Sequence, residues 1–299
     1  MPDRPETCAA PRPVSTASAP ELHVPELACD CHAHIFPVGE TGSLDPARSY
    51  TPASAPEGDY AELMARLGLG RSVIVQPSVY GTDNRVTIDA VARDPANRRA
   101  VVVVTSETGA SALQALRRDG ATGARVNLLF ESGHARPDPT RLGHALTEAG
   151  MHLQLLVDAV DFDVAGDVLA RTPKDLAVVL DHFGHVSLAS HRSELVADRL
   201  RLLLDTDRVW IKLSGAYRIT AERAPPYRDV APLARMLVAH RPDRLIWGTD
   251  WPHPAIDVEM PDDGSLLNAL GDWCPDDDAR RRILVDNPAR LYRFERDAA

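Results

Sequence analysis

The chain of 299 residues lacks the features that mark several protein classes. It has only four cysteines, Cys8, Cys29, Cys31 and Cys274, which are too few and too scattered for a disulfide framework or a zinc ribbon. No apolar run approaches the ~20 residues that cross a bilayer, and the N-terminus has no hydrophobic signal core. We therefore expect a cytoplasmic protein in a reducing compartment, with no membrane partner.

The sequence also has little positive charge. Its formal net charge is −10 and it has no long basic block, so we expect no nucleic-acid partner. The short run Arg280–Arg282 is expected to be a solvated helix face. No G-x-G-x-x-G motif follows a strand, so a dinucleotide site has no support.

Two regions differ in composition. Residues 1–26 are rich in Pro, Ala, Ser and Thr without helical or strand periodicity, and we expect them to form a mobile extension. Residues 27–299 have an ordinary globular composition, with 44% hydrophobic and 25% charged residues in the whole chain, and are expected to form one domain.

Short apolar runs alternate with amphipathic stretches along this domain. The runs are Val-, Ile- and Leu-rich and nearly continuously apolar, as is typical of parallel strands that are buried on both faces. The eight expected strands are Leu27–His34, Ser72–Gln76, Ala100–Val104, Gly123–Asn127, His152–Val157, Leu176–Asp181, Val209–Ser214 and Arg244–Gly248.

Helices are expected between these strands and after the last one. They cover Asp59–Leu67, Asp83–Arg93, Ser111–Arg118, Pro139–Glu148, Phe162–Arg171, Arg192–Leu204, Val230–Ala239 and Asp276–Val285, and Asn287-Pro288 is expected to end the last helix. Eight strand–helix units predict an α/β fold, a (β/α)8 TIM-like barrel; an open doubly wound sheet is the alternative.

Two histidines at the end of the first strand are the most informative feature. His32 and His34 are two residues apart, so they point to the same face of a strand and can share a metal ion or a substrate carbonyl. Cys31 between them should face away and pack in the core. Active sites of such barrels form at the carboxyl ends of the strands, where His182 and Asp250 also lie.

Four segments in this order carry a resemblance to a known family. The chain resembles the amidohydrolase superfamily, and within it the lactonase branch that includes 2-pyrone-4,6-dicarboxylate hydrolase and 4-sulfomuconolactone hydrolase. The segments are Asp30–His34, Gln76–Asn84, Asp181–Gly184 and Gly248–Pro252, and the resemblance spans residues 27 to 293.

The resemblance implies a water-activating site made of His32, His34, His182 and Asp250. Three imidazoles and one carboxylate suit a divalent ion, most simply Zn²⁺, and Asp250 would take the proton of the attacking water. A metal-free version, in which the histidines polarise the carbonyl, is also open. The lysine or glutamate that bridges two metals has no equivalent on the fourth and fifth strands, so we expect one metal or none.

The resemblance also implies residues that bind the substrate. Arg125 and Arg218 match contacts to a substrate carboxylate, which a guanidinium binds with two hydrogen bonds. Ser78 and Tyr50 match further contacts around the same ligand.

Other positions depart from the branch. Gln154 and His253 stand where the pyrone hydrolase has a tyrosine and an asparagine, and we expect both to contact substrate. A second arginine in the loop after the fourth strand has no clear equivalent, although Arg136 lies further on. His185 can belong to the site or to its surroundings.

The sequence thus predicts hydrolysis of a small anionic lactone, carboxylated or sulfonated, in aromatic or sugar-acid catabolism. A zinc-dependent non-oxidative decarboxylase and a non-catalytic ligand-binding barrel are the alternatives. An oligomer is possible, and the sequence does not specify one.

Overall fold

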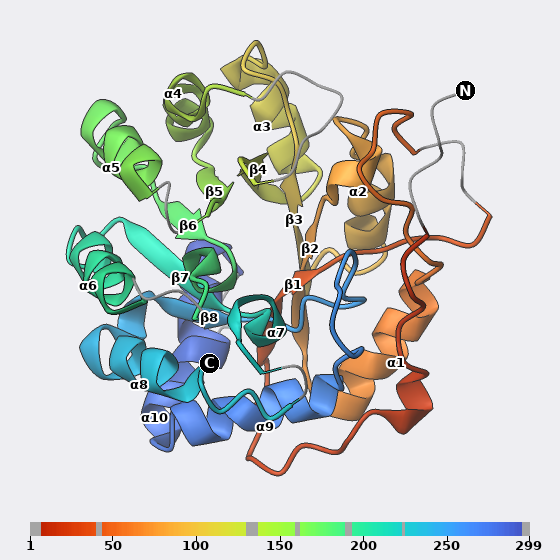
Figure 1. The fold of residues 1–299 in the computed structure, drawn as a ribbon. Helices are drawn as coiled ribbons and strands as arrows, with labels where there is room; N and C mark the ends of the chain where they lie inside the picture. The colour runs from red at the N-terminus through yellow and green to blue at the C-terminus, as the bar shows by residue number, and fades with distance from the viewer. Residues whose placement is uncertain are drawn as a thin grey trace.

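The computed structural model describes residues 7–39, 44–129, 137–158, 162–188, 193–222 and 225–294. Eight parallel strands follow one another in a single sheet in chain order, and helices surround them (Figure 1). The strands are β1 Cys29–Ala33, β2 Arg71–Val75, β3 Arg98–Val102, β4 Ala121–Asn127, β5 His152–Leu156, β6 Val178–Leu180, β7 Val209–Leu213 and β8 Leu245–Trp247. The predicted barrel is therefore confirmed, and each predicted strand overlaps an observed one.

Within the described residues, seven of the predicted helices are observed, in the order predicted. They are α1 Glu57–Leu67, α2 Arg85–Ala92, α3 Ala110–Arg118, α4 Pro139–Ala149, α5 Phe162–Arg171, α6 Ser193–Leu204 and α8 Ala231–His240. Local sequence explains several ends. Gly68 and Gly150 close α1 and α4 in the left-handed conformation, and the Asp138 carboxylate accepts from the backbone N–H of Thr140 at the start of α4.

Shorter helical turns lie in the connections. They are the 3-10 turns η1 Val14–Thr16, η3 Ser78–Tyr80, η5 His182–His185 and η6 Pro242–Arg244, and the single-turn helix α7 Ala216–Ile219. Two of these turns, η5 and α7, follow β6 and β7 directly and form part of the barrel mouth.

The chain after β8 differs from the prediction. A helix that the sequence reasoning missed, α9 Asp263–Trp273, precedes α10 Asp277–Arg281. The predicted stop at Asn287-Pro288 is wrong: the π-helical turn η7 Arg282–Asp286 leads into α11 Asn287–Leu291. Pro288 is tolerated because it lies in the first turn of α11, where its missing N–H needs no partner.

The predicted solvated face at Arg280–Arg282 is wrong for its first member. Arg280 is buried, and its Nη1 donates to the Cys274 carbonyl at 2.7 Å, whereas Arg281 and Arg282 are exposed. The guanidinium thereby fixes the turn between α9 and α10.

The two faces of the sheet pack into different clusters. One face packs against the helices, with residues such as Ile74 and Val102. Alternate residues on the other face, including Val73, Val75 and Cys31, pack with Tyr292 and Phe294 from the C-terminal segment and fill the barrel interior. The predicted core position of Cys31 is confirmed, since its side chain is fully buried.

The described part of the N-terminal extension lies against α9. The Ser18 backbone N–H donates to the Asp262 carboxylate at 3.0 Å, and the Glu21 N–H donates to the Asn268 side chain at 2.7 Å. Gly264 allows this contact, because a Cβ there would meet the Ser18 carbonyl oxygen at 1.9 Å. Residues 1–6 are outside the described residues, and the mobility of the extension stays a prediction.

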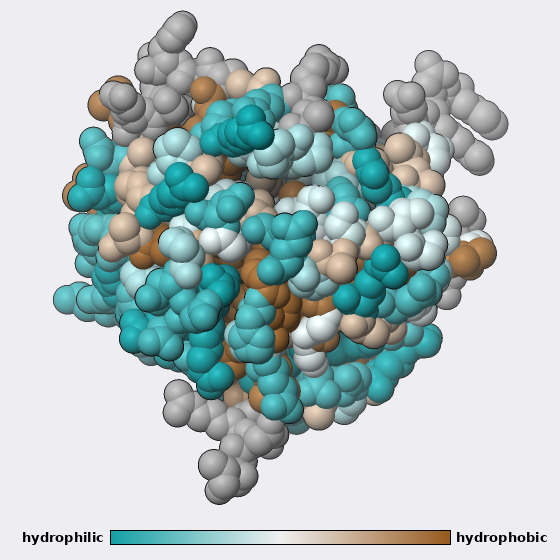
Figure 2. Space-filling model, turned by 90° about the horizontal axis from the view of Figure 1, so that it is seen from below, coloured by the Kyte–Doolittle hydropathy of each residue, from teal (hydrophilic) through white to brown (hydrophobic). Residues whose placement is uncertain are grey.

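Seen from below the view of Figure 1, hydrophilic residues cover most of the face, with a narrow apolar strip near its middle (Figure 2). In the described ranges no helix has the length and hydropathy needed to cross a membrane.

Candidate active site

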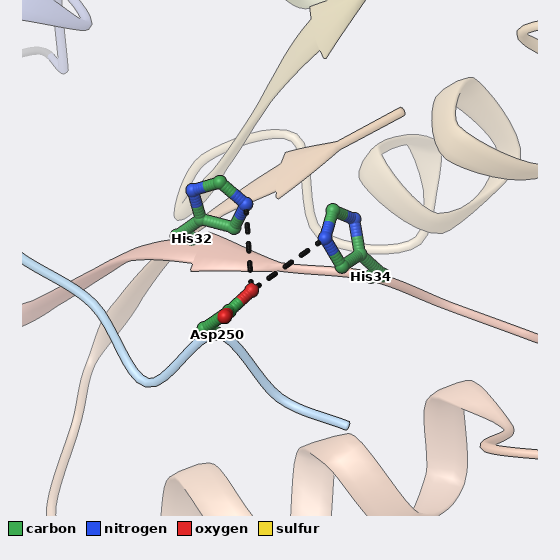
Figure 3. Close-up of side chains that lie close together, drawn as sticks. All are labelled: His32, His34 and Asp250. Atoms are coloured by element: carbon green, nitrogen blue, oxygen red, sulfur yellow. Dashed lines mark ion pairs between the residues drawn. The ribbon is translucent and has the colours of Figure 1, made fainter. Parts of the chain in front are cut away.

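The four predicted catalytic residues meet at the carboxyl ends of three strands. His32 lies in β1 and His34 just after it, His182 begins the turn after β6, and Asp250 follows β8. Figure 3 shows the rings of His32 and His34 on either side of the Asp250 carboxylate. His182 and Asp250 have φ angles of 49° and 66°, a left-handed conformation that costs free energy in non-glycine residues and is concentrated at functional sites.

Three imidazole nitrogens surround the Asp250 carboxylate. Its Oδ1 lies 3.7 Å from Nε2 of His32 and 3.7 Å from Nε2 of His34, and its Oδ2 lies 3.9 Å from Nε2 of His182. All four side chains are buried. The prediction that these residues converge is therefore confirmed.

The hydrogen bonds that the structure gives to the Asp250 carboxylate come from the turn α7. Its Oδ2 accepts from the Tyr217 hydroxyl at 2.5 Å and from Arg218 Nε at 2.6 Å. Burial raises the pKa of Asp250, but the Arg218 guanidinium beside it outweighs burial and holds the pKa well below its usual value. The carboxylate is ionised at neutral pH, as a general base requires.

The histidines are neutral at neutral pH. Burial lowers the pKa of His34 and of His182 well below the usual value, and burial followed by the charge of Lys212 lowers that of His32. His34 Nδ1 lies 2.7 Å from the Val75 carbonyl oxygen. Since a carbonyl only accepts, Nδ1 of His34 carries the proton and its Nε2 presents a lone pair to the site.

A second carboxylate joins the first and last strands behind the site. Asp30 accepts hydrogen bonds from the backbone N–H groups of His32 and Thr249, from the Thr249 hydroxyl at 2.6 Å and from the Tyr60 hydroxyl at 3.0 Å. The backbone of Asp250 also donates to the His32 carbonyl at 2.8 Å. Gly248 permits this approach, since a Cβ there would lie 2.7 Å from the His32 nitrogen.

Below the histidines lies a polar layer that the sequence reasoning did not assign. Lys212 from β7 lies 2.9 Å from Gln154 Oε1, 3.2 Å from Asp181 Oδ1 and 3.2 Å from His32 Nδ1. Its signal in the sequence was a lysine inside the otherwise apolar strand Val209–Leu213. Tyr217 was missed as well, because its contact with Asp250 depends on the fold.

Four predicted substrate-binding residues line one small cavity above Asp250. The cavity has a volume of about 30 Å³ and includes Tyr50, Ser78, Arg125 and Arg218 in its wall, along with His34, His182 and His185. Burial raises the pKa of Tyr50 to about 12, so its hydroxyl is protonated and can donate. Arg125 is held in place by donating to the Gln76 carbonyl at 2.9 Å.

Arg218 is already engaged on two sides. Its Nε binds Asp250, and its Nη2 donates to the Pro254 carbonyl at 2.9 Å. Arg218 therefore forms an ion pair with Asp250, and it also lies in the cavity wall.

The other two predicted substrate-binding residues do not line this cavity. Gln154 donates from Nε2 to Asp181 Oδ2 at 2.9 Å, in the polar layer. His253 is buried behind Asp250, with Nδ1 3.0 Å from the Tyr217 hydroxyl and Nε2 3.2 Å from Asp263. Partners from neighbouring elements hold these two side chains away from the cavity, and their contact with substrate stays a prediction. Arg136 lies outside the described residues.

The site fits one divalent ion. His32, His34 and Asp250 offer ligand atoms that all lie within 4.8 Å of one another. His32 Nε2 and Asp250 Oδ1 are buried without a hydrogen-bond partner among the described residues, which is a state that a cation would relieve.

The fold, the histidine pair and the aspartate after β8 agree with the comparison to known families. The amidohydrolase family model matches residues 29–294. The chain belongs to this amidohydrolase family.

Relatives of this amidohydrolase include lactone hydrolases. It is 37% identical to the 4-sulfomuconolactone hydrolase of Hydrogenophaga intermedia, over 90% of this chain and 89% of that protein. It is 34% identical to the 2-pyrone-4,6-dicarboxylate hydrolase of Comamonas testosteroni, over 92% of this chain and 93% of that protein. A crystal structure of an Agrobacterium tumefaciens protein in its apo form matches with a TM-score of 0.79 at 29% identity, over 93% of this chain and 99% of that one.

Proposed function

We propose that this amidohydrolase hydrolyses a small anionic lactone, carboxylated or sulfonated, in the catabolism of an aromatic compound or a sugar acid. The observation that carries the proposal is the ionised Asp250 among three neutral imidazoles, below a cavity that Arg125 and Arg218 line. The names of the relatives at 37% and 34% identity, both lactone hydrolases, support the reaction class.

The residues divide the work as follows. Asp250 Oδ1 accepts a proton from the attacking water, while Tyr217 and Arg218 keep Oδ2 in place. His34 presents a lone pair and orients that water. The water oxygen bonds to the lactone carbonyl carbon, the bond from that carbon to the ring oxygen breaks, and Asp250 returns the proton to the leaving ring oxygen. The products are an alcohol and a carboxylic acid, which releases its remaining proton to solvent.

Substrate charge is recognised at the cavity wall. The Arg125 side chain is 6% exposed and lies 3.9 Å from Asp181, a distance at which the guanidinium keeps hydrogen-bonding capacity for a ligand. Tyr50 and Ser78 donate hydrogen bonds to the same acidic group. The chain's overall negative charge makes this local positive charge necessary for capture of an anion.

His32, His34, His182 and Asp250 would hold the divalent ion, most simply Zn²⁺. When bound, such an ion would polarise the lactone carbonyl and lower the pKa of its water. We place the reaction in the cytoplasm, since all four cysteines are free thiols.

A lactone panel tests the proposal. Purified protein, with and without prior chelation, is given carboxylated, sulfonated and neutral lactones, and ring opening is followed by NMR. We expect turnover of anionic lactones, loss of turnover in Asp250→Asn, and no loss in Asp205→Asn, an aspartate paired with His240 at the surface.

The two alternatives give different outcomes. Release of carbon dioxide from an aromatic acid without lactone turnover would establish a decarboxylase instead. Tight binding of a lactone without any product, unchanged in Asp250→Asn, would indicate a ligand-binding barrel.

A further inference from the structure

Lys212 is a lysine buried inside the barrel. Its side chain is fully inaccessible, and it points from the middle of β7 into the polar layer below the histidines. A buried ammonium is unfavourable unless its donors are paired, so its contacts determine its role.

In two of these contacts, the structure shows that Lys212 is the donor or the positive partner. Gln154 Nε2 donates to Asp181 Oδ2 at 2.9 Å, so the Gln154 oxygen faces Lys212 and accepts from it at 2.9 Å. Lys212 also lies 3.2 Å from Asp181 Oδ1. Asp181 thus accepts from Gln154 at Oδ2 and forms an ion pair with Lys212 at Oδ1.

The third contact falls on His32. Its Nδ1 lies 3.2 Å from Lys212 Nζ and 3.3 Å from Asp181 Oδ1. If Nδ1 carried the proton, its acceptor would be Asp181 Oδ1 at 3.3 Å, and Nδ1 could not accept from the Lys212 ammonium at 3.2 Å. If Nδ1 carries the lone pair, it accepts an N–H of Lys212, and the ammonium then has hydrogen bonds to Gln154 and His32 beside its ion pair with Asp181.

We propose that Lys212 is a positioning residue that keeps the proton of His32 on Nε2, so that His32 faces the reaction site as a hydrogen-bond donor. His34 has the opposite arrangement, because the Val75 carbonyl fixes its proton on Nδ1. The two rings of the pair therefore differ: His34 offers a lone pair to the water, and His32 offers an N–H to the lactone carbonyl oxygen.

The same arrangement disfavours a metal. A metal ligand needs its lone pair on the nitrogen that faces the ion, and for His32 that nitrogen is Nε2. Ligation by His32 requires the proton to move to Nδ1, where Asp181 would accept it and where the Lys212 ammonium opposes it. Lys212 thereby weakens metal binding by a site whose side chains otherwise suit it.

The tautomer can be measured directly. Chelated protein with ¹⁵N-labelled histidine gives separate NMR signals for protonated and unprotonated ring nitrogens, and the His32 signals are those absent from His32→Asn. We expect the proton on Nε2 in the wild type and on Nδ1 in Lys212→Met, where Asp181 becomes the partner of Nδ1. A wild-type proton on Nδ1, or a proton on Nε2 in both proteins, would overturn the proposal.

Metal affinity gives a second measurement. Zn²⁺ alone is titrated into chelated protein against a chromophoric chelator. Because partners of metal-binding histidines change affinity on the order of 10- to 100-fold, we expect Lys212→Met to bind Zn²⁺ tighter by such a factor. The matched control is Lys174→Met, which removes the other lysine of the sequence, an exposed one, and should leave the affinity unchanged.

A double variant separates the tautomer from the loss of charge. Lys212→Met/Asp181→Asn removes both buried charges, so it lacks the carboxylate that would hold the proton on Nδ1. We expect it to lose most of the gain in Zn²⁺ affinity. An equal gain in Zn²⁺ affinity in the single and double variants would contradict the proposal. If Lys212→Met fails to fold, the position of the His32 proton in the wild type still tests the proposal.

The role of His32 as donor to the lactone rests on the proposed function, and the two fail separately. A wild type that opens no lactone but keeps the proton on Nε2 refutes the function and leaves the role of Lys212 intact. A wild type that opens lactones but carries the His32 proton on Nδ1 supports the function and refutes the role of Lys212.

Discussion

The hydroxyl of Thr249 holds the first and last strands together, and Thr249→Val removes it with almost no change in shape. Thr249 is fully buried, and its hydroxyl donates to Asp30 Oδ2 at 2.6 Å. The hydroxyl oxygen of Thr249 also accepts from the Trp251 backbone N–H at 3.0 Å. Valine removes both hydrogen bonds and leaves the methyl packing.

The two losses set the expected magnitude. A hydrogen bond to a charged group contributes about 1.5–3 kcal/mol, and a buried N–H left without a partner costs about 1–3 kcal/mol. The Thr249 N–H still donates to Asp30 Oδ1 at 2.9 Å, so part of the junction survives. We expect the free energy of unfolding to fall by about 3 kcal/mol, a large fraction of the ~5–15 kcal/mol typical of a folded protein.

Urea unfolding, followed by circular dichroism and tryptophan fluorescence, measures this change. Thr147→Val is the matched control, because its hydroxyl donates to the Gly143 carbonyl within α4 and lies away from the junction. We expect kcat/KM for the lactone to fall at least about tenfold in Thr249→Val, since Asp250 is the next residue. A loss of stability within about 0.5 kcal/mol of that of the control would refute the reasoning.

Three further predictions follow from buried charged and titratable groups. Arg125→Met should weaken binding of an anionic lactone by about 10- to 100-fold and leave binding of a neutral lactone unchanged, as a KM comparison would reveal. Because burial lowers the pKa of His34 and His182 well below the usual value, kcat/KM should stay level as pH falls through 6.5; a titration centred near 6.5 would contradict the neutral site. Burial lowers the pKa of His152 to about 3, so the unfolded chain takes up its proton first on acidification. His152 should therefore contribute about 2 kcal/mol to the loss of stability between neutral pH and pH 5, and His152→Gln should show about that much less loss in urea titrations at the two pH values.

The barrel could be predicted because its strands are apolar on both faces. Each buried run stands out from the amphipathic helices around it, and the glycine at positions 68 and 150 ends a helix where the prediction places the end. The helix α9 was missed although Asp262 caps it and Leu266, Leu267, Leu270 and Trp273 form its buried face. Gly264 and Gly271 lower its intrinsic helix propensity, and a long connection separates it from β8.

The site was predictable where a residue's role follows from its place at a strand end. His32, His34, His182 and Asp250 were found this way. The contacts among Lys212, Asp181 and Gln154 were not predicted, because these residues are far apart in the sequence. They form one group only when β5, β6 and β7 lie side by side. The same limit explains why the position of His253 behind the base was not predicted.

The junction between the first and last strands has a consequence for synthesis of the chain. The Ala33–Trp251 bridge and the hydrogen bond from His34 N–H to the Trp251 carbonyl at 2.8 Å are made by the segments that carry the histidines and the aspartate. The chain must therefore be synthesised beyond residue 251 before this catalytic geometry can form. No N-terminal fragment that stops short of residue 251 can hold the site, which keeps incomplete chains from reacting with lactones.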